Sequence, residues 1–454
     1  MLRKIGLFVI VVLFLNNTAW TQDFGFSFDD TETSAQNQFV SISGEVSAAI
    51  IGYFDEMIEG AKHINTRDMF MFSGKLNFSA QSHFAQGVIN LKLVPSLVPV
   101  SIDEAYIRAF FGDLDVSAGF RKITWGKADQ FGPLDIINLP DQSKIFIEMA
   151  DNNNLNGVKI ANPLIHASYR FGQFSKLECV FLPSFEIVSM AISSAIGNDD
   201  DFLTLVSGPI SKRWIPAEMK KLSQMIPPDA FLMPDTSGLD YAQAGLRFTT
   251  TIGSADLGVQ YFYGRMFQPA VKFISPTAPD VLPSIEFLFN IYHQIGIDYA
   301  QVLAGFNIRA EVAANITEDL KGDDGYIYNP SIGWSFGFDR NIFAGININL
   351  QANGSVRLFN DKVGIDDIEA GKPITSTRIT TMLSKKFLRD EFELRTAVVW
   401  GIEDEDCVII PALIWMKDDL RAAFSGGFFL GDSNGQLGQY KDNNFLKISV
   451  TYIF

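Results

Sequence analysis

The chain has 454 residues, a formal net charge of −16 at pH 7 and 40 phenylalanines. The acidic balance argues against nucleic acid as a partner. No apolar run of roughly 18 residues follows the N-terminus, which excludes membrane-spanning helices, yet aromatic residues are abundant. A membrane β-barrel combines these properties, because only alternate residues of each strand meet lipid.

Residues 1–22 have the features of a secretory signal peptide. Arg3 and Lys4 form a basic start, and residues 5–15 form a short apolar core. Such a segment is cleaved after export, so the sequence predicts an exported protein. Residues 23–38 are polar and rich in phenylalanine, and we interpret them as a periplasmic lead-in that precedes the folded domain.

Segments of alternating polarity follow, and each predicts a strand with one apolar face. Their ranges are 39–53, 68–80, 83–94, 101–111, 113–124, 155–171, 175–183, 240–250, 255–265, 286–300, 302–314, 326–338, 341–352, 373–385, 390–400, 407–416, 419–430 and 445–454. No linker divides them, so residues 39–454 are predicted to form a single domain.

The connections between these segments differ in length in a regular way. Those after even-numbered segments are short, and those after odd-numbered segments are mostly long, as in 125–154 and 184–239. Short periplasmic turns that alternate with long outer loops are typical of outer-membrane barrels. We therefore predict an all-β, transmembrane antiparallel barrel of about 18 strands, with 16 as the other count that fits.

The final segment, 445–454, has Leu446, Ile448, Val450 and Phe454 on one parity and polar residues on the other. It resembles the terminal strand of bacterial outer-membrane barrels, whose last residue is typically Phe. The resemblance implies that Phe454 is an assembly signal. It also implies location in the bacterial outer membrane, with lipid and the barrel-assembly machinery as partners.

Charged residues on the inward parity are candidates for a channel wall. The basic candidates are Lys75, Arg108, Arg247, Arg309, Arg378 and Arg395, and Glu178, Asp298 and Glu311 are among their acidic counterparts. A basic wall would favour anions. The alternative is that these residues form cross-strand pairs that stiffen the wall and select nothing.

The most distinctive stretch follows the fifth predicted strand. It combines Arg121, Trp125, Gly126, Lys127, Asp129, Asp135, Asn138 and Asp141. The pattern R-x-x-x-W-G-x-x-D and a later D-x-x-N element resemble a family of single-chain outer-membrane barrels similar to alginate-export and phosphate-selective porins. The family has Pro directly after Asn, whereas this chain has Leu139-Pro140, so the local turn differs. The resemblance implies passive transport, and we expect loop 125–154 to fold inward and narrow the pore.

The sequence offers little support for other chemistry. The four histidines lack metal-ligand spacing and no G-x-S-x-G element occurs, so we expect neither an enzyme nor a metal or other cofactor. Cys179 and Cys407 are expected to be free thiols. Within loop 184–239, the stretch Ala217 to Met225 predicts a short helix.

These observations favour a diffusion channel for small polar solutes, with anions among them. Two alternatives stay open. The phenylalanines at 24, 26 and 28 would suit a transporter of hydrophobic compounds, and loop 184–239 would suit a surface adhesin or scaffold with a closed lumen. The sequence leaves both a monomer and a trimer open.

Overall fold

The computed structural model describes residues 39–54, 69–93, 100–130, 132–151, 155–185, 214, 217, 231–274 and 284–454. The predicted signal peptide, the lead-in and nearly all of the helix predicted near 217–225 lie outside these residues, so these three predictions stay untested.

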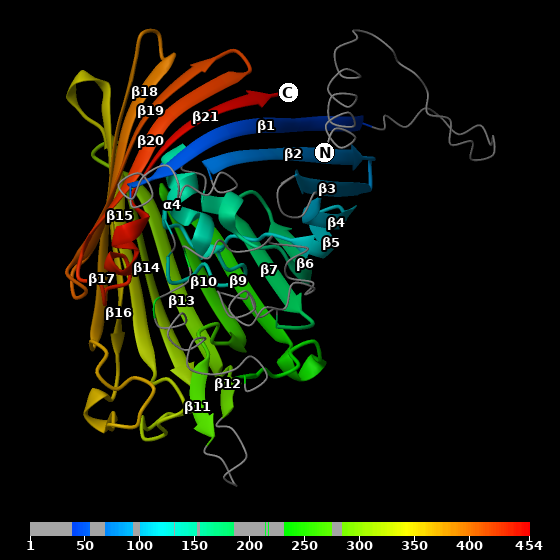
Figure 1. Ribbon diagram of the computed structural model, residues 1–454. Helices are drawn as coiled ribbons and strands as arrows, with labels where there is room; N and C mark the ends of the chain where they lie inside the picture. Colours follow the sequence, from blue (N-terminus) through cyan, green and yellow to red (C-terminus); the bar gives the residue numbers. More distant parts are fainter. Residues whose placement is uncertain are drawn as a thin grey trace, which may run out of the picture. The chain divides into compact units, whose positions relative to one another are not determined.

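Eighteen strands form one sheet in which each strand pairs antiparallel with its neighbours in the chain (Figure 1). The ring closes because the first strand also pairs with the last, with Glu45 opposite Ile453 and Tyr53 opposite Phe445. The strands are β1 (Phe39–Tyr53), β2 (Phe70–Gln81), β3 (Ala85–Leu93), β4 (Ser101–Phe111), β5 (Leu114–Arg121), β6 (Asn162–Phe171), β7 (Ser175–Leu182), β9 (Gln243–Ile252), β10 (Ala255–Arg265), β13 (Ile291–Leu303), β14 (Phe306–Thr317), β15 (Ser331–Asn341), β16 (Ile346–Arg357), β17 (Thr375–Phe387), β18 (Phe392–Gly401), β19 (Asp406–Lys417), β20 (Leu420–Gly431) and β21 (Phe445–Ile453). The predicted barrel and its count of 18 are confirmed.

The burial pattern is inverted relative to a water-soluble protein. Along β21, Ile448, Val450 and Tyr452 are exposed, whereas Lys447, Ser449 and Thr451 are buried. The same pattern of exposed apolar and buried polar residues recurs on other strands: Ile297 of β13 is exposed and Asp298 is buried. An apolar outer face and a polar inner face are what lipid outside and water inside require.

The turns between paired strands lie at one end of the barrel and the longer connections at the other, as predicted. Several predicted turn positions are wrong by a few residues. The turn after β13 is at Ala304 and Gly305, not Gln301, and both have positive φ (51° and 79°), as a tight hairpin with matching twist requires. The turn expected at Asp339-Arg340 lies within β15, which continues to Asn341.

Additional elements occur in the long connections. A three-stranded sheet combines β8 (Phe231–Leu232), β11 (Ala270–Ile274) and β12 (Ser284–Leu288), so the predicted strand 286–300 wrongly merged β12 with β13. The α-helix α4 (Gln142–Asp151) interrupts the β5–β6 connection. Short 3-10 helices are η1 (Leu155–Val158), η4 (Leu239–Tyr241), η5 (Phe343–Gly345), η6 (Asn360–Lys362) and η7 (Gly438–Asn443). Across the described ranges, every helix is too short or too polar to cross a membrane.

Candidate functional site

In the connection between β5 and β6, the described residues 122–130, 132–151 and 155–161 lie inside the barrel rather than above it. They contact the inner faces of strands far from their own in sequence: Gln130 bonds to Gln351 of β16, and Phe146 of α4 packs on Phe429 of β20. We call this segment the lumenal loop and its part 126–134 the tip.

The loop is rooted by Trp125. The Trp125 side chain is 2% exposed and packs with Ile123, Leu182 and Phe262. Gly245 of β9 lies directly beneath the indole, where a Cβ would overlap the ring. The next residue, Gly126, has φ +91°, a conformation that few residues other than glycine adopt, and it turns the chain away from the strand direction.

The tip binds the inner wall of β10, β13, β14 and β16. Glu311 of β14 accepts hydrogen bonds from the backbone N–H groups of Lys127, Ala128 (2.7 Å) and Leu134 (3.4 Å). Gln294 Nε2 donates to the Pro133 carbonyl (2.9 Å) and Gln260 Nε2 to that of Leu134 (3.1 Å). The tip is therefore held by several strands at once.

Asp129 contacts wall residues near the turn end of the barrel. Its carboxylate pairs with Arg309 and accepts a hydrogen bond from Asn349 Nδ2 (2.8 Å), and both partners are close to the turn end of their strands. Burial raises the pKa of Asp129, and the Asn349 hydrogen bond and Arg309 only partly oppose this rise. The tip thus carries an acidic group far into the lumen.

The returning arm is fixed by Asn138, which is fully buried. Its Oδ1 accepts from the Ile123 N–H (2.7 Å), and its Nδ2 donates to the carbonyls of Arg121 (3.0 Å) and Ile160 (2.8 Å). One side chain therefore joins the departing arm to the returning arm.

Beside Asn138, Asp135 forms a buried ion pair with Lys159 (2.7 Å), whose side chain is 1% exposed. Burial raises the pKa of Asp135, against the lowering effect of Lys159. Lys159 was predicted within a strand, which is wrong: β6 begins at Asn162, and Lys159 only bridges to Pro140. The local alternation of polarity had extended past the true start of the strand.

The helix α4 packs against the opposite side of the barrel, on β19 and β20. Phe146 meets the Phe429 ring edge-on at 5.0 Å, within a cluster that includes Trp214 and Tyr440. Arg395 of β18 donates to the carbonyls of Met149 (3.2 Å) and Ala150 (3.3 Å), in the last turn of the helix. A cation at this end also interacts favourably with the helix dipole.

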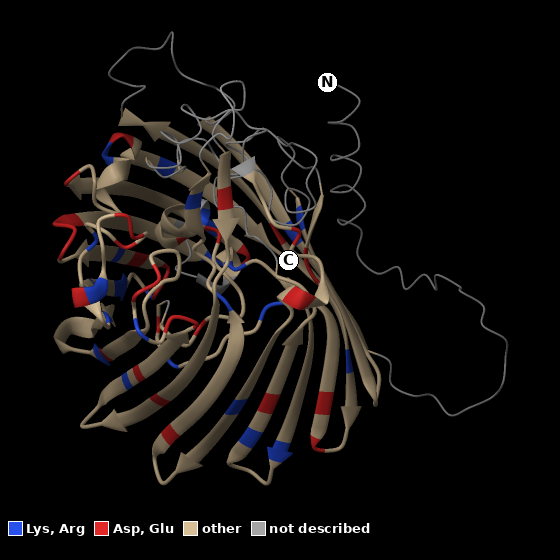
Figure 2. Cartoon of the chain, turned by 90° about the horizontal axis from the view of Figure 1, so that it is seen from below, with Lys and Arg blue, Asp and Glu red and all other residues tan. Residues whose placement is uncertain are grey.

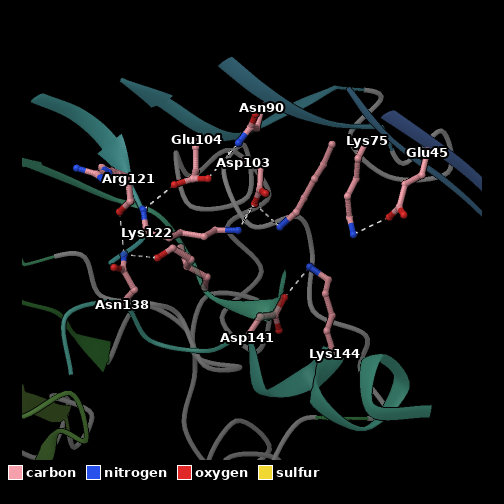
Figure 3. A network of polar contacts seen from close by, with 12 residues as sticks. Glu45, Lys75, Asn90, Asp103, Glu104, Arg121, Lys122, Asn138, Asp141 and Lys144 are labelled. Atoms are coloured by element: carbon pink, nitrogen blue, oxygen red, sulfur yellow. Dashed lines mark hydrogen bonds and ion pairs between the residues drawn. The ribbon is translucent and has the colours of Figure 1, made fainter. Parts of the chain in front are cut away.

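A charged network faces the start of α4 from β1–β4 and the end of β5 (Figure 3). Asp103 binds both Lys92 and Lys122 at 2.5 Å, and Lys75 binds Glu45 at 2.8 Å. Across from them, Asp141 pairs with Lys144 at 2.6 Å. Lys92, Asp103, Asp141 and Lys144 enclose a cavity of only about 10 Å³, so the loop and this wall are nearly in contact.

Charges of both signs are intermixed along the barrel (Figure 2). Five of the six predicted lumenal cations are in ion pairs: Lys75–Glu45, Arg108–Asp115, Arg247–Asp298, Arg309–Asp129 and Arg395–Glu393. The sixth, Arg378, lies within electrostatic range of Asp404 and Asp406. Most of the predicted basic wall is thus locally compensated.

The residues of the sequence motif divide between two places. Trp125, Gly126, Asp135 and Asn138 surround the root of the loop, and Arg121 lies beside them, bonded to Ser117 and stacked on Tyr106. Asp141 lies at the start of α4. Lys127 and Asp129 belong to the tip, where Lys127 Nζ is 3.7 Å from Asp256.

Sequence reasoning missed α4, the Asp103 network and the role of Glu311. Alternation places a side chain on a face, but it carries no signal for which distant loop that side chain binds. Both cysteines are free. Among the described residues, no group of three or more His, Cys, Asp or Glu side chains is arranged to hold a metal ion.

No protein-family model matches the chain, and no curated protein matches it. Several solved structures are similar to it over most of its length. OccK11 (OpdR) of Pseudomonas aeruginosa is 8% identical, with 92% of this chain and 96% of that chain covered and a TM-score of 0.48. A BenF-like porin from Pseudomonas fluorescens Pf-5 is 7% identical, with 91% and 98% covered and a TM-score of 0.49. Wzi of Escherichia coli, an outer-membrane protein described as a carbohydrate-binding β-barrel, is 9% identical, with 90% and 84% covered and a TM-score of 0.45.

Proposed function

We propose that the protein is an outer-membrane diffusion channel for small polar solutes, with the lumenal loop as its constriction. The observation that carries this proposal is the loop's position: its tip binds β14 while α4 packs on β20, so the segment crosses the interior of a closed barrel. The exposed apolar outer face supports the membrane location.

The polar lining supports water-soluble cargo. Charged side chains on the inner face that stay partly exposed include Glu45, Lys75, Arg108 and Arg309. Such groups stabilise hydrated solutes, and an apolar compound would gain little from them. On the described residues, this lining favours the channel over a transporter of hydrophobic compounds.

The proposal also includes a preference for anions, which is argued from the charged network around Asp103. Asp103 is shared by two lysines, Lys92 and Lys122, where α4 approaches the wall, and the adjacent Glu104 accepts hydrogen bonds from Asn90 Nδ2 and from the Lys122 N–H. Because five of the six predicted lumenal cations are in ion pairs, we propose a mild anion preference rather than strict selection.

The test is planar-bilayer conductance with reversal potentials in a salt gradient. The wild-type protein is expected to form steady channels, with a reversal potential that indicates mild selectivity for anions over cations. Lys122→Gln should shift that potential toward cations, whereas Lys385→Gln, which changes an exposed lysine at the end of β17, should not. An absence of conductance in the wild type would refute the channel and favour the scaffold.

The loop's part in the constriction is tested by shortening the tip. Removing residues 128–138 is unsuitable for this test, because the deletion would remove Asn138 and leave the buried Lys159 without its partner Asp135. Replacing residues 127–133 by two glycines keeps both contacts. This variant is expected to raise single-channel conductance, and an unchanged value would show that the tip does not limit the flow.

A further inference from the structure

We infer that Glu311 is the positioning residue that seats the tip of the lumenal loop on the barrel wall and thereby sets the width of the pore. This inference rests on the proposed function and assigns a control point to it.

The first evidence is the geometry around the Glu311 carboxylate. One oxygen accepts from the N–H groups of Lys127 and Ala128, and the other from Leu134, so that a single side chain gathers both ends of the tip. Glu311 is 2% exposed. Charged acceptors make stronger hydrogen bonds than neutral ones, particularly where water is excluded.

The second evidence is the shape of the tip. A Cβ on Gly126 or on Gly132 would overlap the Glu311 carboxylate. The tip therefore has glycine at both places where its backbone wraps the acid. Backbone amides that converge on an anion form a fitted cradle. The fit involves the wall residue and the loop sequence together.

The third evidence is the electrostatic setting. Glu311 is directly opposite Asp298 on β13 and Ser335 on β15. Two carboxylates opposite one another repel. Arg247 pairs with Asp298 at 2.6 Å, and the amides of the tip stabilise Glu311. Lifting the tip would expose the acid beside a like charge, so the seated loop and the charged Glu311 stabilise each other.

The remaining contacts of the tip are mostly neutral. Gln130, Pro133 and Leu134 exchange hydrogen bonds with glutamines of the wall, and Asp129 pairs with Arg309 further along the barrel. Glu311 lies between these two groups of contacts. Its loss should free the tip while leaving Trp125 and Asn138 to hold the root.

The first experiment compares Glu311→Gln with Glu178→Gln in single-channel recordings. Glu178 of β7 is also buried and inward-facing, but its partners are His166 and Lys176 rather than the tip. Both changes remove one lumenal negative charge at nearly constant volume. Glu311→Gln is expected to add a second, larger conductance level with frequent transitions, and Glu178→Gln to keep the single level of the wild type.

The second experiment perturbs the same contact from the loop side. Gly132→Ala should produce the same additional level, because its Cβ displaces the carboxylate, whereas Gly87→Ala, at a site with open space, should not. This pair also decides the matter if Glu311→Gln fails to insert. If Glu311→Gln and Gly132→Ala both match their controls in a conducting protein, the inference is overturned and the channel proposal stands.

Hydrogen exchange in detergent separates the two proposals in the opposite case. Glu311→Gln is expected to speed exchange of the amides of Lys127, Ala128 and Leu134 by about tenfold or more, as local opening becomes more frequent. Faster exchange together with a non-conducting wild type would support Glu311 as the residue that holds the tip and reject the channel. Unchanged exchange would reject the role of Glu311 in holding the tip.

Discussion

Asn138 offers the sharpest test of how the lumenal loop is anchored. Asn138→Ala removes three hydrogen bonds from a fully buried site: those to the Ile123 N–H and to the carbonyls of Arg121 and Ile160. At about 1 kcal/mol net for each bond, the loss is about 3 kcal/mol. Because 1.4 kcal/mol corresponds to a factor of ten, opening of the loop root should become about 100-fold more frequent.

The assay is hydrogen exchange of the peptide that contains Ile123, followed by mass spectrometry in detergent. Its exchange should accelerate by about two orders of magnitude, while peptides from β13 and β14 exchange as before. Asn347→Ala is the matched control, because the Asn347 Nδ2 donates to Asn341 Oδ1 (2.9 Å) in an exposed hydrogen bond near the start of β16. Unchanged protection of Ile123 would refute the view that Asn138 joins the two arms.

Three further outcomes are expected. Asp135→Asn leaves Lys159 buried without its counter-charge and should lower the free energy of unfolding by about 3 kcal/mol or more in denaturant titrations, whereas adding Lys159→Met should recover most of this loss. Burial raises the pKa of Asp129, so as the pH falls this carboxylate becomes neutral at a pH above the usual Asp pKa of about 4. In that pH range the reversal potential should shift in the direction of greater anion selectivity. Asp129→Asn should abolish the part of the shift that occurs above about pH 4. Deleting Phe454 should reduce the amount of inserted barrel without changing the conductance of each channel, and normal insertion would contradict its role as an assembly signal.

The inner and outer faces of the wall could be predicted from the sequence because they depend on a period of two residues. Errors in strand ends did not disturb them: the strand predicted at 341–352 is observed at Ile346–Arg357, yet Asn349 and Gln351 still face inward. Parity belongs to each residue, whereas a boundary depends on the turn. The alternation of short and long connections likewise needs only their order along the chain.

The arrangement inside the barrel was decided by tertiary structure. The sequence singled out Trp125, Gly126 and Asn138 as a motif, and it placed Glu311 and Arg309 on the inner face. The sequence did not show which of these residues contact one another, because the contacting residues are far apart in the chain. Glu311 is 177 residues from Leu134, and Gln130 is 221 residues from Gln351. Contacts over such distances follow from closure of the ring and from the space left within it. For the same physical reason, the sequence alone could not show that most lumenal cations have acidic partners. An ion pair depends on the positions of two segments of the chain, whereas alternation describes only one segment at a time.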